Sequence, residues 1–103
     1  MTDRMIRLLG LGMRAGQVVV GVAGVRARLQ QGAVQCVVLA ANASDRTLEK
    51  VERLARARGV PVLRGPDARE LGQRLGRDAE VQAVGVEDNA LARGVVESIG
   101  GAQ

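Results

Sequence analysis

The chain has 103 residues, with 15 basic against 11 acidic side chains and a formal net charge of +4, and its length allows one hydrophobic core but not two. It contains no histidine and a single cysteine, Cys36, which excludes intrachain disulfides, cysteine–histidine zinc sites and histidine acid–base chemistry. It also contains no aromatic residue, which excludes aromatic stacking platforms for single-stranded nucleic acids.

The positive charge is concentrated in the first part of the chain. Residues 1–44 carry five arginines and one aspartate, whereas residues 45–103 carry equal numbers of basic and acidic side chains. A basic face of this kind suits a polyanion, although arginine can also serve simply as a surface cation. No signal peptide is visible, and the apolar runs are far shorter than the roughly 20 residues of a membrane-spanning helix, so we expect a cytoplasmic protein.

Apolar residues at helical spacing alternate along the chain with short β-branched runs. This pattern predicts five helices separated by four strands. In chain order the expected elements are a helix at 4–13, a strand at 18–20, a helix from 22 to 31, a strand at 35–41, a helix from 45 to 58, a strand at 60–63, a helix from 68 to 75, a strand at 81–86 and a helix from 89 to 99.

Two of these strands also carry information about their place in the sheet. Residues 35–41 are apolar without interruption, which predicts a central strand covered on both faces, with Cys36 as a core residue. Pro61 lacks a backbone N–H donor and therefore predicts an edge strand or a strand start. Alternating helices and strands indicate an α/β fold in which helices cover both faces of a largely parallel or mixed sheet.

Side chains suited to helix capping occur at three predicted helix starts. These are Ser44 or Asp45, Asp67 with Glu70 three residues later, and Asp88. Capping explains Asp67 and Glu70 without a catalytic role, and no carboxylate in the chain comes with a nucleophile, a base and an orienting partner. We therefore expect no enzymatic activity.

The segment GLGMRAG at residues 10–16 looks like a phosphate-binding glycine loop. Such a loop must follow a strand and open a helix, whereas this segment ends a helix and precedes a strand. Carbonyl groups at a helix end carry partial negative charge, which disfavours a phosphate. Gly16 is therefore interpreted as a helix stop, and Gly10 and Gly12 as positions where another element approaches closely.

The segment with the correct polarity for an anion is Gly21–Gly24, between the first strand and the second helix. Its free backbone N–H groups could meet a phosphate or a base edge. The predicted helical wheel leaves an outward strip flanked by two arginines; the strip is Ala23, Gly24, Ala27 and Gln31, and the arginines are Arg26 and Arg28. Small residues beside arginines suit a nucleic-acid backbone, and an ordinary solvent-exposed face fits the same pattern.

Five segments occur in an order that resembles a known family: LGLGMRAGQVVVG, a helix ending in QQG, CVVLAANAS, a helix ending in RARGVPV, and ELGQRLG before VQAVGV. Together they resemble the kink-turn-binding ribosomal-protein family of ribosomal proteins L-seven-Ae and L-thirty-e, in its small stand-alone bacterial branch. The resemblance implies a three-layer α/β/α sandwich with a four-stranded mixed sheet. It also implies that residues 1–103 form one ribosomal-protein-like RNA-binding domain.

Members of this family insert the start of the second helix into a kink-turn, and the loop before the last strand packs on flipped-out bases. Gly21 matches the start of the family's Gly-x-Asn-Glu motif, but the Asn and Glu fall on Ala23 and Gly24, and the usual basic residue falls on Ala27. The side chains that would read G·A pairs are therefore missing. The RNA-binding residues that the resemblance implies are Arg14, Gly21, Val22, Ala23, Gly24, Arg26, Arg28, Asn42, Gly76, Arg77, Asp78, Ala79 and Glu80.

The implied partner is a structured RNA, either a kink-turn or ribosomal RNA, together with ribosomal or assembly proteins. No cofactor, metal or membrane is expected. An alternative is a protein-interaction module that has kept the fold and uses the bare strip of the second helix as a protein contact. Asn42 is also compatible with a plain turn role.

Overall fold

The computed structural model describes residues 2–100 and alternates helices with strands in the predicted order. The elements are α1 (Thr2–Arg14), β1 (Val18–Val20), α2 (Val22–Gln30), β2 (Cys36–Leu39), α3 (Asp45–Thr47), the π-helical segment η1 (Leu48–Glu52), α4 (Arg53–Ala57), β3 (Val62–Arg64), α5 (Ala68–Arg74), β4 (Ala83–Val86) and α6 (Asn89–Gly100). The last three strands are shorter than or offset from the predicted spans, because flanking apolar residues lie in loops that pack on the core. The segments α3, η1 and α4 form one continuous stretch, called here the α3–α4 helix (residues 45–57).

The four strands form a mixed sheet in the order β1-β4-β2-β3. Strand β4 is antiparallel to both β1 and β2, and β3 is parallel to β2. Because β1, β2 and β3 all run the same way, their last residues meet the first residues of β4 at one end of the sheet. We call this the carboxyl end of the sheet. Strand β2 is central and β3 is an edge strand, as the apolar run and Pro61 predicted.

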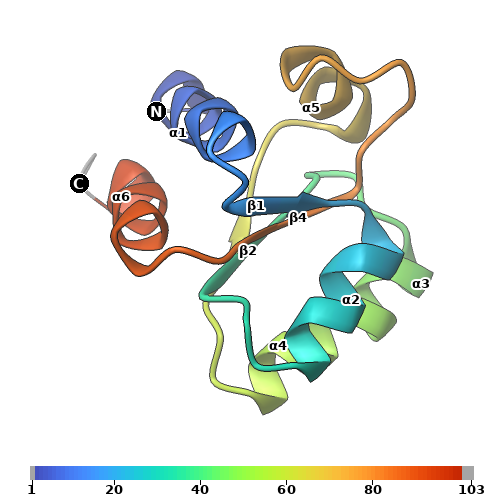
Figure 1. Ribbon diagram of the computed structural model, residues 1–103. Helices are drawn as coiled ribbons and strands as arrows, with labels where there is room; N and C mark the ends of the chain where they lie inside the picture. Colours follow the sequence, from blue (N-terminus) through green and yellow to red (C-terminus); the bar gives the residue numbers. More distant parts are fainter. Residues whose placement is uncertain (1, 101–103) are drawn as a thin grey trace.

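Helices α1, α5 and α6 cover one face of the sheet, and α2 and the α3–α4 helix cover the other (Figure 1). Alternate side chains of β2 enter the two cores: Cys36 and Val38 pack with α1, α5 and α6, while Val37 and Leu39 pack with α2 and the α3–α4 helix. All four residues are fully buried. The uninterrupted apolar run therefore reflects burial on both faces, and the predicted three-layer α/β/α sandwich is confirmed.

Gly12 of α1 and Gly72 of α5 allow close packing in a core that has no aromatic side chain. A Cβ atom at Gly12 would collide with Leu91 of α6 and Val18 of β1. A Cβ atom at Gly72 would collide with the carbonyl oxygen of Ala79, in the loop before β4. Gly10 has open space around it, so only Gly12 fits the expectation of close approach in the first helix.

None of the helices within residues 2–100 combines the length and the apolar character needed to cross a bilayer.

We expect Gly72→Ala to lower the free energy of unfolding by about 1–3 kcal/mol, because the backbone of the Ala79 loop must move to admit a methyl group. Gly10→Ala is the matched control, since it also adds a methyl group to a helix but meets no atom within 4 Å. The control should stabilise the protein by up to about 1 kcal/mol through helix propensity. Urea unfolding followed by far-ultraviolet circular dichroism measures both, and equal effects of the two substitutions would contradict the packing argument.

Burial raises the pKa of the Cys36 thiol to about 12, whereas an exposed thiol has a pKa of about 8.5. The folded protein should therefore resist alkylation at pH 8 and react once unfolded in urea. The free energy of unfolding should also fall as the pH rises above about 8.5, because the unfolded state loses the thiol proton first. Cys36→Ala should remove this pH dependence, and a slope that survives the substitution would assign it to another group.

Candidate nucleic-acid interface

The carboxyl end of the sheet brings together three connections that are distant in sequence. The amide of Gly21, at the turn from β1 to α2, donates to the Ala83 carbonyl at 2.9 Å. The amide of Ala40, at the end of β2, donates to the Gln82 carbonyl at 2.9 Å. The amide of Val81 donates to the Ala68 carbonyl at 3.0 Å, which ties the loop before β4 to the start of α5. The predicted segments around Gly21, Asn42 and Gly76–Glu80 thus lie at one end of the molecule (Figure 1).

Gln82 is a further residue at this end, and it was not predicted from the sequence. Its Oε1 atom accepts hydrogen bonds from the Ser44 amide at 3.0 Å and from the Thr47 hydroxyl at 2.7 Å. One side chain therefore fixes the start of the α3–α4 helix against β4. The only local signal was a polar residue inside the apolar run VQAVGV.

Helix α2 begins without a side-chain cap, unlike three other helices. Ser44 accepts from the Thr47 amide, Asp67 from the Glu70 amide, and Asp88 from the Leu91 amide, so those three predicted caps are confirmed. Gly21 precedes α2 with φ 105°, a conformation that favours glycine, and offers no capping side chain. Gly21 therefore supplies no acceptor for the N–H groups in the first turn of α2. These groups lie at the positive end of the helix dipole.

The exposure of the residues near the start of α2 differs from the helical-wheel prediction at one position. Ala23 and Ala27 are exposed, as predicted. Gly24 is instead half-buried, and a Cβ atom there would lie 2.8 Å from Cγ2 of Val19. The prediction that Gly24 faces outward is wrong, because α2 packs on β1 at this position. Only the backbone of Gly24 is available to a ligand.

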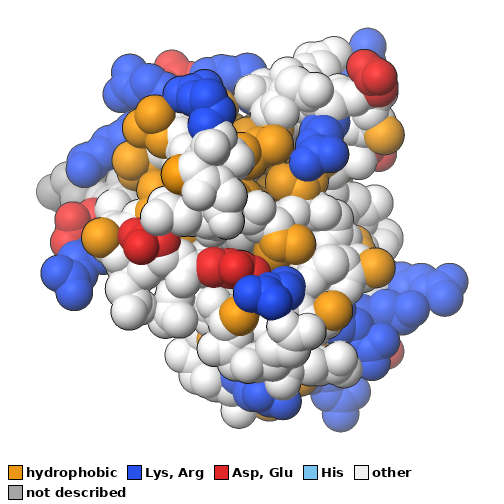
Figure 2. Space-filling model, in the orientation of Figure 1, with side chains coloured by type: hydrophobic (Ala, Val, Ile, Leu, Met, Phe, Trp, Pro, Cys, Tyr) orange, Lys and Arg blue, Asp and Glu red, His pale blue; other side chains and the backbone are white. Residues whose placement is uncertain are grey.

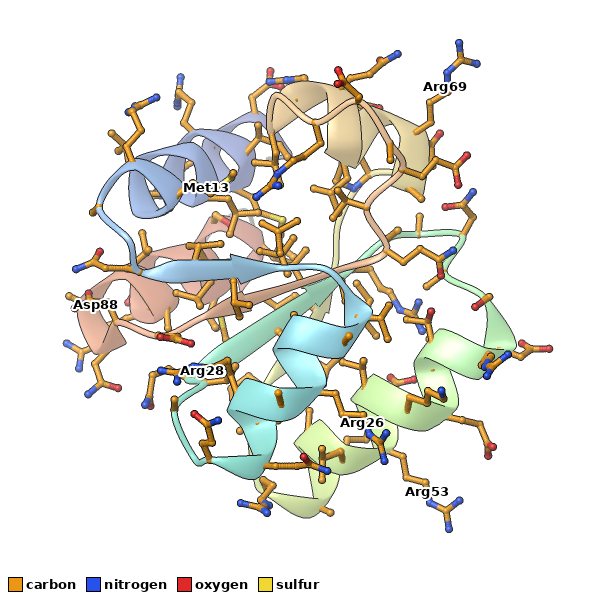
Figure 3. All side chains as sticks on the ribbon, turned by 45° about the vertical axis from the view of Figure 1, so that its right-hand side comes forward. Met13, Arg26, Arg28, Arg53, Arg69 and Asp88 are labelled. Carbon is orange, nitrogen blue, oxygen red and sulfur yellow. The ribbon has the colours of Figure 1, made fainter. Side chains whose placement is uncertain are left out.

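The two arginines of α2 diverge in direction. Arg26 is exposed and lies between α2 and the α3–α4 helix (Figure 3). Arg28 donates from Nε and Nη2 to the two carboxylate oxygens of Glu87, at 2.6 and 3.1 Å, and from Nη1 to Gln31 at 2.6 Å. The hydrogen bond and the charge of Glu87 raise the pKa of Arg28. Because Glu87 follows β4, Arg28 is held at the opposite end of the sheet, where it borders the predicted outward strip through its hydrogen bond to Gln31.

Two other predicted residues have different surroundings from those expected. Asn42 lies at the carboxyl end, but its Oδ1 atom accepts a hydrogen bond from the Ala68 amide at 2.8 Å and so supports the start of α5. Arg14 is exposed at the end of α1, three residues before Gln17, whose carbonyl accepts from the Glu87 amide. The Arg14 side chain lines a hollow between α1 and α5 together with Arg7 and Arg74.

The loop before β4 is exposed and carries one basic and two acidic side chains. It begins at Gly76, which ends α5 with φ 74°, and continues through Arg77, Asp78, Ala79 and Glu80. These four residues line a hollow of about 480 Å³ together with two side chains of α5, Arg69 and Gln73. The contact of Gly72 with Ala79 holds this loop against α5. Among the described residues, no three Cys, Asp or Glu side chains gather in a way that would hold a metal ion.

The model of the Ribosomal protein L7Ae/L30e/S12e/Gadd45 family matches residues 3–96. The chain belongs to this family. The resemblance seen in the sequence is thereby confirmed. Members of the L7Ae/L30e family are non-enzymatic RNA-binding proteins, which agrees with the absence of catalytic residues expected from the sequence.

Individual relatives agree with the family assignment. The large ribosomal subunit protein eL30 of Pyrobaculum calidifontis is 32% identical over 83 residues, which are 80% of this chain and 82% of that protein. A protein of unknown function from Bacillus halodurans C has a TM-score of 0.86 and 29% identity, covering 94% of this chain and 97% of its own. The 15.5kD RNA binding protein of Giardia lamblia shares the fold, with a TM-score of 0.76 and 19% identity over 96% of this chain and 84% of its own.

We expect Asn42→Ala to lower the free energy of unfolding by about 1 kcal/mol, because the Ala68 amide at the start of α5 loses its acceptor. Asn42→Asp is the matched control, since a carboxylate still accepts this hydrogen bond and is favoured near a helix N-terminus. Urea unfolding should show a loss for the alanine variant and near wild-type stability for the aspartate variant. Equal stability of all three proteins would show that the side chain has no structural role.

Proposed function

We propose that this protein is a non-catalytic RNA-binding protein of the cytoplasm, associated with the ribosome or its assembly, and that it recognises kink-turn-like structured RNA through the carboxyl end of its sheet. Family membership supports RNA binding, and the archaeal relative is a protein of the large ribosomal subunit. The observation that carries the proposal is the uncapped start of α2, which lies beside the exposed Ala23 at the end of the sheet where three loops meet.

The chemistry of this surface favours recognition of RNA shape. Backbone N–H groups at a helix start bind phosphate oxygens, and the small side chain of Ala23 lets a nucleic-acid backbone come close to them. No Asn or Glu side chain stands at Ala23 or Gly24 to read base edges. Contacts to phosphate and sugar fix the position and orientation of an RNA without reading its sequence directly. We therefore propose that the bent backbone of the RNA, more than its bases, is what the protein recognises.

Titration of a fluorescently labelled kink-turn RNA and of a straight duplex of equal length tests this proposal. A label on the RNA is needed because the protein has no tryptophan or tyrosine. We expect tighter binding to the kinked RNA. We also expect a steep loss of affinity between low and physiological salt, since each phosphate contact contributes about −0.9 to the slope of log K against log salt on a duplex. Equal affinity for both RNAs would contradict shape recognition, and no binding to either would favour the protein-interaction alternative.

A pair of glutamate substitutions locates the binding surface. Ala23→Glu places a carboxylate at the second residue of α2, where it suits the helix dipole but repels phosphate. Ala90→Glu makes the same change at the second residue of α6, which is also exposed but lies away from the α2 start. We expect Ala23→Glu to weaken kink-turn binding about tenfold or more, as for the removal of one charge-assisted hydrogen bond, and Ala90→Glu to leave it unchanged. Similar losses in both variants would assign the effect to net charge.

A further inference from the structure

A basic groove lies between α2 and the α3–α4 helix. It has a volume of about 360 Å³ and is lined on one side by Arg26 and Gln30 of α2, and on the other mainly by Lys50 and Arg53. Figure 3 shows Arg26 between the two helices and Arg53 projecting beyond them, and Figure 2 shows blue side chains gathered over the same helical layer at the lower right. Cations therefore stand on both walls of the groove.

The charges of this groove are less neutralised than those of the surrounding surface. Among the described residues, neither Arg26 nor Lys50 forms an ion pair, and Arg53 has only a loose one, with its Nη1 atom 3.7 Å from Oε1 of Glu49. Both members of that pair are largely exposed, at 82% and 75% of the side-chain surface, so water screens their attraction. Nearby Glu52 faces away from the groove, where Arg56 and Arg64 hold it. The groove thus presents three cations and one weakly held carboxylate.

The groove continues from the surface that we propose for RNA. Arg26 lies three residues after Ala23 and therefore on the same side of α2, one turn further from the helix start. A strand of RNA whose phosphates meet the start of α2 would reach Arg26 next. Both walls of the groove end in long, flexible cationic side chains, which suit the oxygens of successive phosphates. These features fit a sugar–phosphate backbone better than a protein.

We propose that this groove binds the phosphate backbone of the RNA strand that runs on from the element held at the start of α2. The inference rests on the proposed function and extends it, because it assigns a second contact region and a longer RNA. Arg26, Lys50 and Arg53 supply the phosphate contacts, and Glu49 opposes them. The affinity of the protein should therefore depend on the length of RNA beyond the kinked element.

The test compares two labelled RNAs, the minimal kink-turn and the same element extended by several nucleotides at each end. Wild-type protein should bind the extended RNA about tenfold or more tightly, as expected for added phosphate contacts. The variant Arg26→Gln/Lys50→Gln/Arg53→Gln should lose this gain, so that its affinities for the minimal and the extended RNA become equal within about threefold. Its salt slope on the extended RNA should be shallower by about 0.7–0.9 for each phosphate that the variant no longer neutralises.

A second triple variant controls for net charge. Arg4→Gln/Arg7→Gln/Arg93→Gln removes three exposed arginines from α1 and α6, on the other face of the sheet. It should keep the gain from the extension. Glu49→Gln provides a change in the opposite direction, because removing the one carboxylate should tighten binding to the extended RNA and leave the minimal RNA unaffected. A gain of affinity cannot result from misfolding.

The outcomes separate this inference from the proposed function. If wild-type protein binds the minimal kink-turn but gains nothing from the extension, or if the groove variant keeps the gain, the groove is not an RNA contact and the proposed function stands. If both triple variants lose the gain equally, overall charge is responsible and the inference fails. If wild-type protein binds neither RNA, the proposed function fails and the inference fails with it.

Discussion

The last strand of the chain, β4, lies between β1 and β2 and runs antiparallel to both. Its Val84 stands opposite Val20 on one side and Val38 on the other, and every residue of β4 is buried. Because β1, β2 and β3 run in the opposite direction, the start of β4 meets their carboxyl ends. Ala83, the first residue of β4, and Gln82, which precedes it, then accept hydrogen bonds from the connections that follow β1 and β2. The surface that we assign to RNA exists only because this strand is inserted there.

Features governed by neighbouring residues were predictable from the sequence. Capping by Asp67 and Asp88, the helix end at Gly76 and the double-sided burial of β2 each depend on a few consecutive side chains. Two side-chain interactions were not predictable, because the residues that form them lie far apart in the chain. Arg28 and Glu87 are 59 residues apart, and the Asn42 side chain bonds an amide 26 residues away. Only the order of the strands decides that these groups meet.

The wrong prediction that Gly24 faces outward has a similar cause. A helical wheel drawn from apolar positions finds the stripe of Val25 and Leu29, and both are indeed buried. It cannot show that α2 leans on β1 through Val19, since that contact involves a residue without a side chain. Glycine is counted as small and outward on a wheel, whereas here its lack of a Cβ atom lets the helix approach the strand. The same reasoning explains Gly12, which meets α6 and β1.

In this proposal the start of α2 and the neighbouring groove contribute differently to RNA binding. With Gly21 in place of a capping side chain, α2 forgoes only roughly a few tenths of a kcal/mol of helix stability and keeps its first N–H groups available to an external acceptor. Backbone donors of this kind have fixed positions, so they select the shape of a ligand, whereas Arg26, Lys50 and Arg53 are mobile and supply mainly charge. Ala23 has no side chain that could read a base. Discrimination between RNAs must therefore come from the rigid backbone N–H groups of α2, and affinity must come mainly from the three cationic side chains. It follows that salt should weaken binding strongly while changing the preference for a bent backbone much less.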